Sequence, residues 1–160
     1  MIQRIQTVYL LLVVALGVAL VWLPVVQLVS PEDAAELQMY KLNSLRLENC
    51  LGNEGAVTDL PGLWGLLFTT ALIPLLALVD IFLYNKRILQ ARLNIFLVML
   101  CLGYYGVLAL YIWHATLALG VEWHILPWAC IPLISLVLTL MATRAILRDE
   151  ALVRAADRIR

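Results

Sequence analysis

Four long apolar runs decide what this chain can fold into. They cover residues 7–29, 60–83, 93–119 and 123–143. A helix crosses the hydrocarbon core of a bilayer with about 20 apolar residues, since each residue adds about 1.5 Å. An isolated strand in lipid would leave backbone groups unpaired, so helix is expected for every run. The sequence therefore predicts an all-α membrane protein with four transmembrane helices in an antiparallel bundle.

Composition agrees with a membrane location. Hydrophobic residues make up 64% of the 160 residues and charged residues 14%, whereas soluble domains have about 45–50% and about 25%. The charges balance at 11 basic and 11 acidic residues, and we expect no nucleic-acid partner. A secretory signal peptide is the alternative for the first run, but this run exceeds the usual apolar core of about 7–15 residues and lacks a clean A-x-A site. We expect the first helix to be retained.

The basic residues are distributed unevenly along the chain. With four spans both termini lie on one side, and only Lys41 and Arg46 belong to the other side. Cytoplasmic segments of membrane proteins are rich in Lys and Arg. We therefore expect cytoplasmic termini, a cytoplasmic turn over 84–92, a cytoplasmic amphipathic helical tail over 144–160 and a periplasmic loop over 30–59. The cytoplasmic basic residues are Arg4, Lys86, Arg87, Arg92, Arg144, Arg148, Arg154, Arg158 and Arg160.

The tryptophans give an independent indication of the same orientation, because all of them fall at or near the outer ends of the expected spans, where an interfacial belt places them. They are Trp22, Trp64, Trp113, Trp123 and Trp128. The basic turn YNKRILQARLN then fixes orientation and meets anionic lipid headgroups, at about 1 kcal/mol per charge. Docking of a cytoplasmic partner on this turn is the alternative.

Three segments carry a family resemblance. The opening MIQRIQTVYLLL, the middle YNKRILQARLN and the ending RDEALVRAADRIR together resemble a bacterial family of small four-span inner-membrane proteins known only as a domain of unknown function. The resemblance covers essentially the whole chain, and the outer loop matches least well. It implies a Gram-negative cytoplasmic membrane and an uncharacterised role, and it supplies no active-site residues.

The C-terminal segment RAILRDEALVRAADRIR continues the fourth helix without a Gly or Pro to stop it. Leu152, Val153, Ala156 and Ile159 recur at helical spacing, which is typical of an amphipathic helix. Such a basic tail is either a solvated helix end paired with lipid phosphates or a docking element for a partner.

The outer loop contains two local signals. SPED at residues 30–33 has a capping Ser followed by Pro and acids, which predicts a short helix over 31–37. The following LQMYKLNSLRLEN fits either a small hairpin or a helical stripe, since periodicity does not distinguish them. Residues 52–55 are expected to form a turn.

Small and hydroxyl residues inside the spans indicate helix packing. Ser135, Thr139 and Thr143 recur every four residues and so share one face of the fourth helix. Gly103 and Gly106 are expected to let the third helix approach a neighbour closely. Such residues commonly join helices in lipid, where hydrophobic drive between helices is small.

Asp80 is the one charged residue within the second span. Ionisable residues in a span are candidates for function. A structural ion pair with Arg87, Arg4 or Arg144, or a hydrogen-bond anchor, is the favoured interpretation, and a proton carrier is the alternative. The absence of a second carboxylate at similar depth is evidence against a proton relay.

His114, Glu122 and His124 surround the turn near Gly120 and have side chains suitable for zinc or another divalent metal. A hydrogen-bonding interfacial role is favoured over metal, and haem is disfavoured because both histidines lie close together. The chain has neither a C-x-x-C pair nor a nucleotide-binding or hydrolase motif. We expect no cofactor.

These observations together predict a non-enzymatic accessory, scaffolding or assembly subunit of a larger inner-membrane complex. A respiratory complex is one candidate for this larger assembly. The partners of this protein are expected to be lipids and either another membrane protein or a second copy. The alternative is a small-ligand protein: a transporter, or a haem, metal or quinone binder that uses polar groups at the membrane interface.

Overall fold

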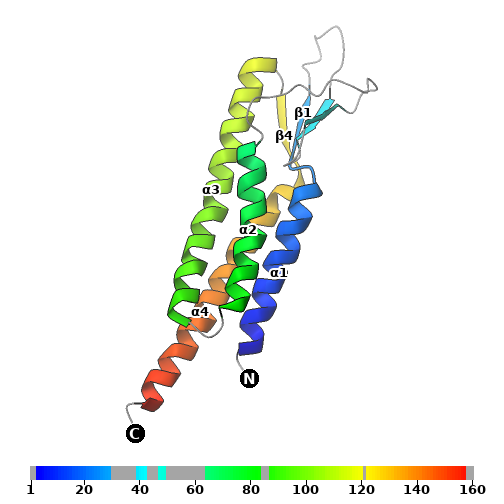
Figure 1. Ribbon diagram of the computed structural model, residues 1–160. Coiled ribbons are helices and arrows are strands. Elements are labelled where there is room, and N and C mark those ends of the chain that lie inside the picture. Colours follow the sequence, from blue (N-terminus) through cyan, green and yellow to red (C-terminus); the bar gives the residue numbers. More distant parts are fainter. Residues whose placement is uncertain are drawn as a thin grey trace.

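The protein forms a bundle of four helices with a small sheet at one end, in a computed structural model that describes residues 3–29, 39–42, 47–49, 64–83, 87–120 and 122–157 (Figure 1). All four helices are long and apolar enough to cross a membrane. The prediction of an all-α four-helix membrane protein is thereby confirmed. The helices are α1 (Gln3–Trp22), α2 (Trp64–Phe82), α3 (Arg87–Leu119) and α4 (Ile131–Asp157).

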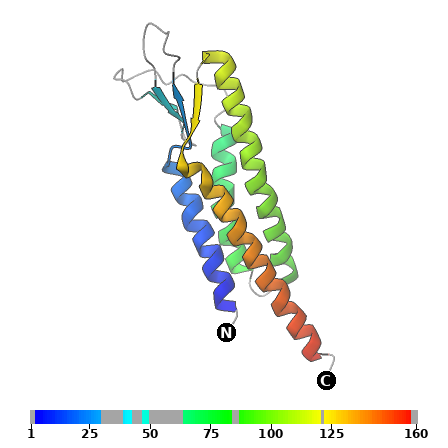
Figure 2. The ribbon, with the colours of Figure 1, turned by 180° about the vertical axis from the view of Figure 1, so that it is seen from behind.

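The helices form a ring in which each packs against two neighbours. α1 lies against α2 and α4, and α3 lies against the same two helices. Both chain ends lie at the end of the bundle opposite the sheet, as the two views agree (Figures 1 and 2). We call these the termini end and the sheet end. Successive helices therefore run in opposite directions.

The sheet has four strands in the order β3-β2-β1-β4, with every pair antiparallel. Val26 and Leu28 of β1 and Leu42 of β2 are buried on one face of it, where they join the apolar core of the bundle. The sheet thus covers the bundle core at this end. The strands are β1 (Val26–Val29), β2 (Met39–Leu42), β3 (Leu47–Asn49) and β4 (Glu122–Ile125).

Two strands come from segments expected to be transmembrane helix. α1 ends at Trp22, two residues before Pro24, and 26–29 continues as β1. Residues 122–125 form β4, followed by the 3₁₀ helix η1 (Pro127–Cys130), before α4 begins at Ile131. The physical reason is the pairing of strands, because β1 and β4 form backbone hydrogen bonds with each other. An apolar run does not reveal whether its backbone will bond within one helix or to another strand.

The other expected boundaries also differ in detail. α3 begins at Arg87, within the expected turn 84–92, and α4 continues to Asp157, well into the tail segment 144–160. Of the two interpretations of LQMYKLNSLRLEN, the structure shows the hairpin, because β2 and β3 pair antiparallel. The expected helix over 31–37 and the turn over 52–55 lie outside the described residues.

α1 and α2 approach each other closely at Gly17. A Cβ atom on Gly17 would lie 2.9 Å from Cδ of Pro74, which is inside α2 and buried. Proline in a helix removes one backbone hydrogen bond and presents a bulky ring. Gly17 has no side chain, so α1 can lie directly against that ring.

Candidate functional site

A buried polar cluster lies between α2 and α3 near the termini end. It consists of Asp80 on α2 and Gln90 and Asn94 on α3, each at most 4% exposed. The Gln90 side-chain amide donates a hydrogen bond to the backbone carbonyl of Asp80 at 3.2 Å. That contact joins the last turn of α2 to the first turns of α3. The buried side chains of α2 at residues 66, 70, 73, 77 and 80 follow helical spacing, which places Asp80 on the interior face.

The carboxyl group of Asp80 is unpaired within the described part of the chain. Neither of its oxygens has a hydrogen-bond partner there, and the same holds for both polar atoms of the Asn94 amide. Arg144, which the sequence offered as an ion-pair partner, is exposed instead. α4 turns this arginine outward, so the expected Asp80–Arg144 ion pair does not form. The side chains of Arg4 and Arg87 lie outside the described set.

A second polar contact closes the bundle at the termini end. The Gln6 amide of α1 donates a hydrogen bond to Oδ2 of Asp149 on α4 at 3.1 Å. Gln6 is 7% exposed, so the contact is largely shielded from solvent. It joins the first and last helices of the chain.

Ser135, Thr139 and Thr143 lie on the interior face of α4, where all three are buried. The Thr139 hydroxyl donates to the Ser135 carbonyl, and the Thr143 hydroxyl donates to the Thr139 carbonyl, both at 2.8 Å. A hydroxyl bonded to its own helix is satisfied without a partner on another helix. This face of α4 can therefore pack against other helices without a hydrogen bond from these threonine hydroxyls to another helix.

Gly103 and Gly106 are placed differently from the expectation. Both are exposed, and a Cβ atom on either would meet nothing within 4 Å. α3 turns this side away from α2 and α4, since its buried face carries residues such as Leu97, Cys101 and Tyr104. No close approach to another described helix of this chain occurs at these glycines. Gly17 is where such an approach is made.

The termini end has an exposed basic surface. Arg92 on α3 and Arg144 and Arg148 on α4 have exposed side chains. Arg4, Arg87 and Arg154 belong to helices that reach the same end, although their side chains are outside the described set. Lys86 and Arg158 lie outside the described residues altogether.

The tryptophans gather at the sheet end. Trp22 closes α1, Trp64 opens α2, and Trp113 lies near the end of α3. Trp123 is in β4 and Trp128 in η1. All five side chains are exposed. Exposed tryptophans at one end and arginines at the other are typical of a helix bundle with two chemically different membrane boundaries.

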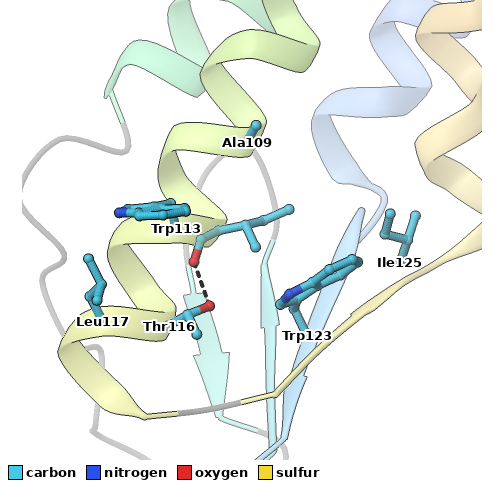
Figure 3. Close-up of a pocket in the computed structure, with 7 residues that line it drawn as sticks. Ala109, Trp113, Thr116, Leu117, Trp123 and Ile125 are labelled. Carbon is cyan, nitrogen blue, oxygen red and sulfur yellow. Dashed lines mark hydrogen bonds between the residues drawn. The ribbon is translucent and has the colours of Figure 1, made fainter.

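An apolar groove of about 610 Å³ lies at the sheet end between α3 and β4 (Figure 3). Its one hydroxyl belongs to Thr116 and already donates to the Ile112 carbonyl at 2.8 Å. The groove therefore offers apolar walls without a free hydroxyl. Its lining is Ala109, Ile112, Trp113, Thr116, Leu117, Trp123 and Ile125.

The three candidate metal ligands do not form a cluster. Glu122 and His124 pair with Val29 and Gln27 of β1, so they lie on the strand face opposite Trp123 and Ile125. His114 is exposed on α3. Within the described parts of the chain, no group of three or more His, Cys, Asp or Glu residues could hold a metal ion.

Nearly the whole chain matches one known protein family. The model of a family described as a domain of unknown function, DUF4293, matches residues 2–159. The chain belongs to this family. No curated protein matches the sequence. Membership in the family confirms the expectation of an uncharacterised domain and assigns no activity to any residue.

Gln90 and Asn94 of this family member are not among the residues that the sequence predicted for a site. Both stand in YNKRILQARLN, whose positive charges suggested an aqueous turn. Their spacing of four residues places them on one helix face, and that was the available signal. It could be used only with the knowledge that the helix already begins at Arg87.

Proposed function

We propose that this protein is a non-enzymatic accessory subunit of a larger complex in a bacterial cytoplasmic membrane, with both termini in the cytoplasm. The exposed arginines at the termini end support this orientation, since basic residues favour the cytoplasmic side. The partner is another membrane protein, which binds the bundle laterally and through the cytoplasmic tail.

The observation that carries the proposal is the projection of α4. Asp149 still contacts Gln6 of α1, yet the helix continues to Asp157 and passes beyond the bundle (Figures 1 and 2). This extension after Asp149 is about 12 Å long at about 1.5 Å per residue. In proteins, most of the stability of a helix comes from packing of one of its faces. A partner surface that packs against the tail would stabilise it.

The chemistry of the tail is consistent with such a partner. In sequence, Leu152, Val153, Ala156 and Ile159 form an apolar stripe among basic residues. A stripe of this kind fits an apolar groove, while the arginines meet acidic side chains. The same arginines hold the bundle in one orientation through anionic lipid headgroups.

Removal of residues 150–160 tests the tail. We expect the truncated chain to lose at least about 10-fold of a copurifying partner, because that loss corresponds to about 1.4 kcal/mol of binding energy. Crosslinking in native membranes followed by quantitative mass spectrometry measures the loss. The truncation keeps Asp149 and its contact with Gln6, so the melting temperature should stay close to that of the full chain.

A matched pair of variants separates binding from charge. Leu152→Ser with Val153→Ser removes part of the apolar stripe and should release the partner, whereas Arg160→Gln changes charge alone and should retain most of it. A full-length chain that crosslinks to no other protein would contradict the subunit proposal.

Orientation is tested separately by fusions at Arg160. A green fluorescent protein attached there should fluoresce, since it folds in the cytoplasm, and alkaline phosphatase attached there should be inactive, since it needs the periplasm. The physical reason is the excess of arginine at this end of the bundle. The reverse pair of results would show the opposite topology.

A further inference from the structure

Asp80 presents a carboxyl group to the interior of a membrane-spanning bundle. The residue is 1% exposed, and neither carboxyl oxygen has a hydrogen-bond partner among the described residues. A buried ionised carboxylate is costly unless a positive charge or several hydrogen bonds compensate it. In structures, ionisable residues in spans mark sites of function for the same reason.

A second unpaired polar side chain, Asn94, lies on α3, the helix that packs against α2 here. It is also 1% exposed, and its amide oxygen and nitrogen are both unpaired within the described chain. The Gln90 to Asp80 hydrogen bond of 3.2 Å sets Gln90 level with Asp80, and Asn94 is one helical turn further along α3. The two unpaired side chains are thus separated by about one turn across the α2–α3 contact.

Helix direction brings these side chains toward each other. Side chains lean toward the N-terminus of their own helix. α2 runs from the sheet end to the termini end, so Asp80 leans toward the sheet end and toward the level of Asn94. α3 runs the opposite way, so Asn94 leans back toward Asp80. Side-chain direction therefore favours the approach of these two polar groups inside the bundle.

The polar atoms of Asp80 and Asn94 favour a cation as the ligand. They offer three acceptor oxygens, namely both carboxyl oxygens of Asp80 and the amide oxygen of Asn94, against one donor nitrogen. At this end of the bundle, the basic side chains that the structure describes on α3 and α4 are exposed. They are Arg92, Arg144 and Arg148. Asp149 is already bonded to Gln6. No described side chain supplies the compensating positive charge, and a bound cation would supply it.

We propose that Asp80 and Asn94 bind a small monovalent metal cation, of which Na⁺ is the probe, inside the bundle. Hard cations prefer oxygen ligands such as carboxylates and amide carbonyls. One carboxylate balances one positive charge, whereas a divalent ion would leave a buried net charge. This inference rests on the α2–α3 geometry and is independent of the proposed subunit role.

Thermal unfolding of the full chain in detergent tests the site. At constant pH and ionic strength, Na⁺ in place of choline should raise the melting temperature by about 3–6 °C at ten times the dissociation constant. Asp80→Asn should abolish this increment. Asp149→Asn is the matched control, because it changes a carboxylate outside the proposed site and should retain the increment.

Direct binding keeps the test valid if Asp80→Asn does not fold. Radioactive Na⁺ should bind the wild-type chain at close to one ion per molecule, and Asn94→Leu should weaken that binding by at least about 10-fold. Equal melting temperatures of the wild-type chain in Na⁺ and choline would overturn the proposal. Stabilisation that follows pH alone would also overturn it, since a proton would then be the ligand.

Discussion

A Gly17→Leu variant should lose about 2–3 kcal/mol of stability, because a side chain at this position has no room. Even a Cβ atom would lie 2.9 Å from Cδ and 3.0 Å from Cβ of Pro74. The proline ring is rigid and sits in the middle of α2, so it cannot move aside as a flexible side chain would. Inserting atoms into a packed interior costs about 1–3 kcal/mol through strained rotamers and backbone shifts. Unfolding titration in mixed micelles measures the loss.

Gly103→Leu is the matched control for this prediction. It makes the same chemical change in another apolar helix, at a position where a Cβ atom meets nothing within 4 Å. Leucine also favours helix by up to about 1 kcal/mol over glycine. Its stability should equal or exceed that of the wild type. Equal destabilisation of both variants would show that α1 and α2 do not pack through Gly17 and Pro74.

A Leu28→Ala variant should lose about 2–4 kcal/mol, since truncation of a fully buried leucine removes apolar contacts and leaves a cavity. Leu28 has no exposed surface and belongs to the apolar core. It also stands opposite Tyr40 and Trp123 in the central strand of the sheet. The variant should therefore weaken the attachment of the whole sheet to the bundle, which hydrogen exchange of β1 amides would report alongside the unfolding titration.

Gln27→Ala provides the control on the neighbouring residue. Its side chain is on the opposite strand face, with Lys41 and His124 beside it, and it is only half-buried. Its truncation should cost less than about 0.5 kcal/mol, as for most surface substitutions. A larger loss for Gln27→Ala than for Leu28→Ala would mean that the sheet packs through its other face.

Of the buried polar cluster, only Asp80 could be predicted from its residue type, and its contacts could not. Asp80 stands out in the sequence, since it is the one charge of its span. The residues around Asp80 cannot be predicted in the same way. The neighbours on α3 and the outward direction of Arg144 depend on which face each helix turns to the interior of the bundle. That orientation is set by packing of whole faces, such as Gly17 against Pro74, and no local pattern encodes it.

Gly103 and Gly106 also show that the sequence does not reveal which helix faces meet. Small residues are typical of close helix contacts in lipid, yet the face that carries these two glycines is exposed. A spacing pattern identifies a face but not the helix that the face meets. Gly17, which has no paired small residue to mark it, makes the contact instead.

The sequence by itself determined the number of membrane-spanning helices, since about 20 apolar residues in lipid have no alternative to helix. It also determined the uneven distribution of charge between the two ends. Only the tertiary structure decided that 26–29 and 122–125 leave the helices and form β1 and β4. The physical reason is that a strand needs a partner from elsewhere in the chain, whereas a helix satisfies its own hydrogen bonds.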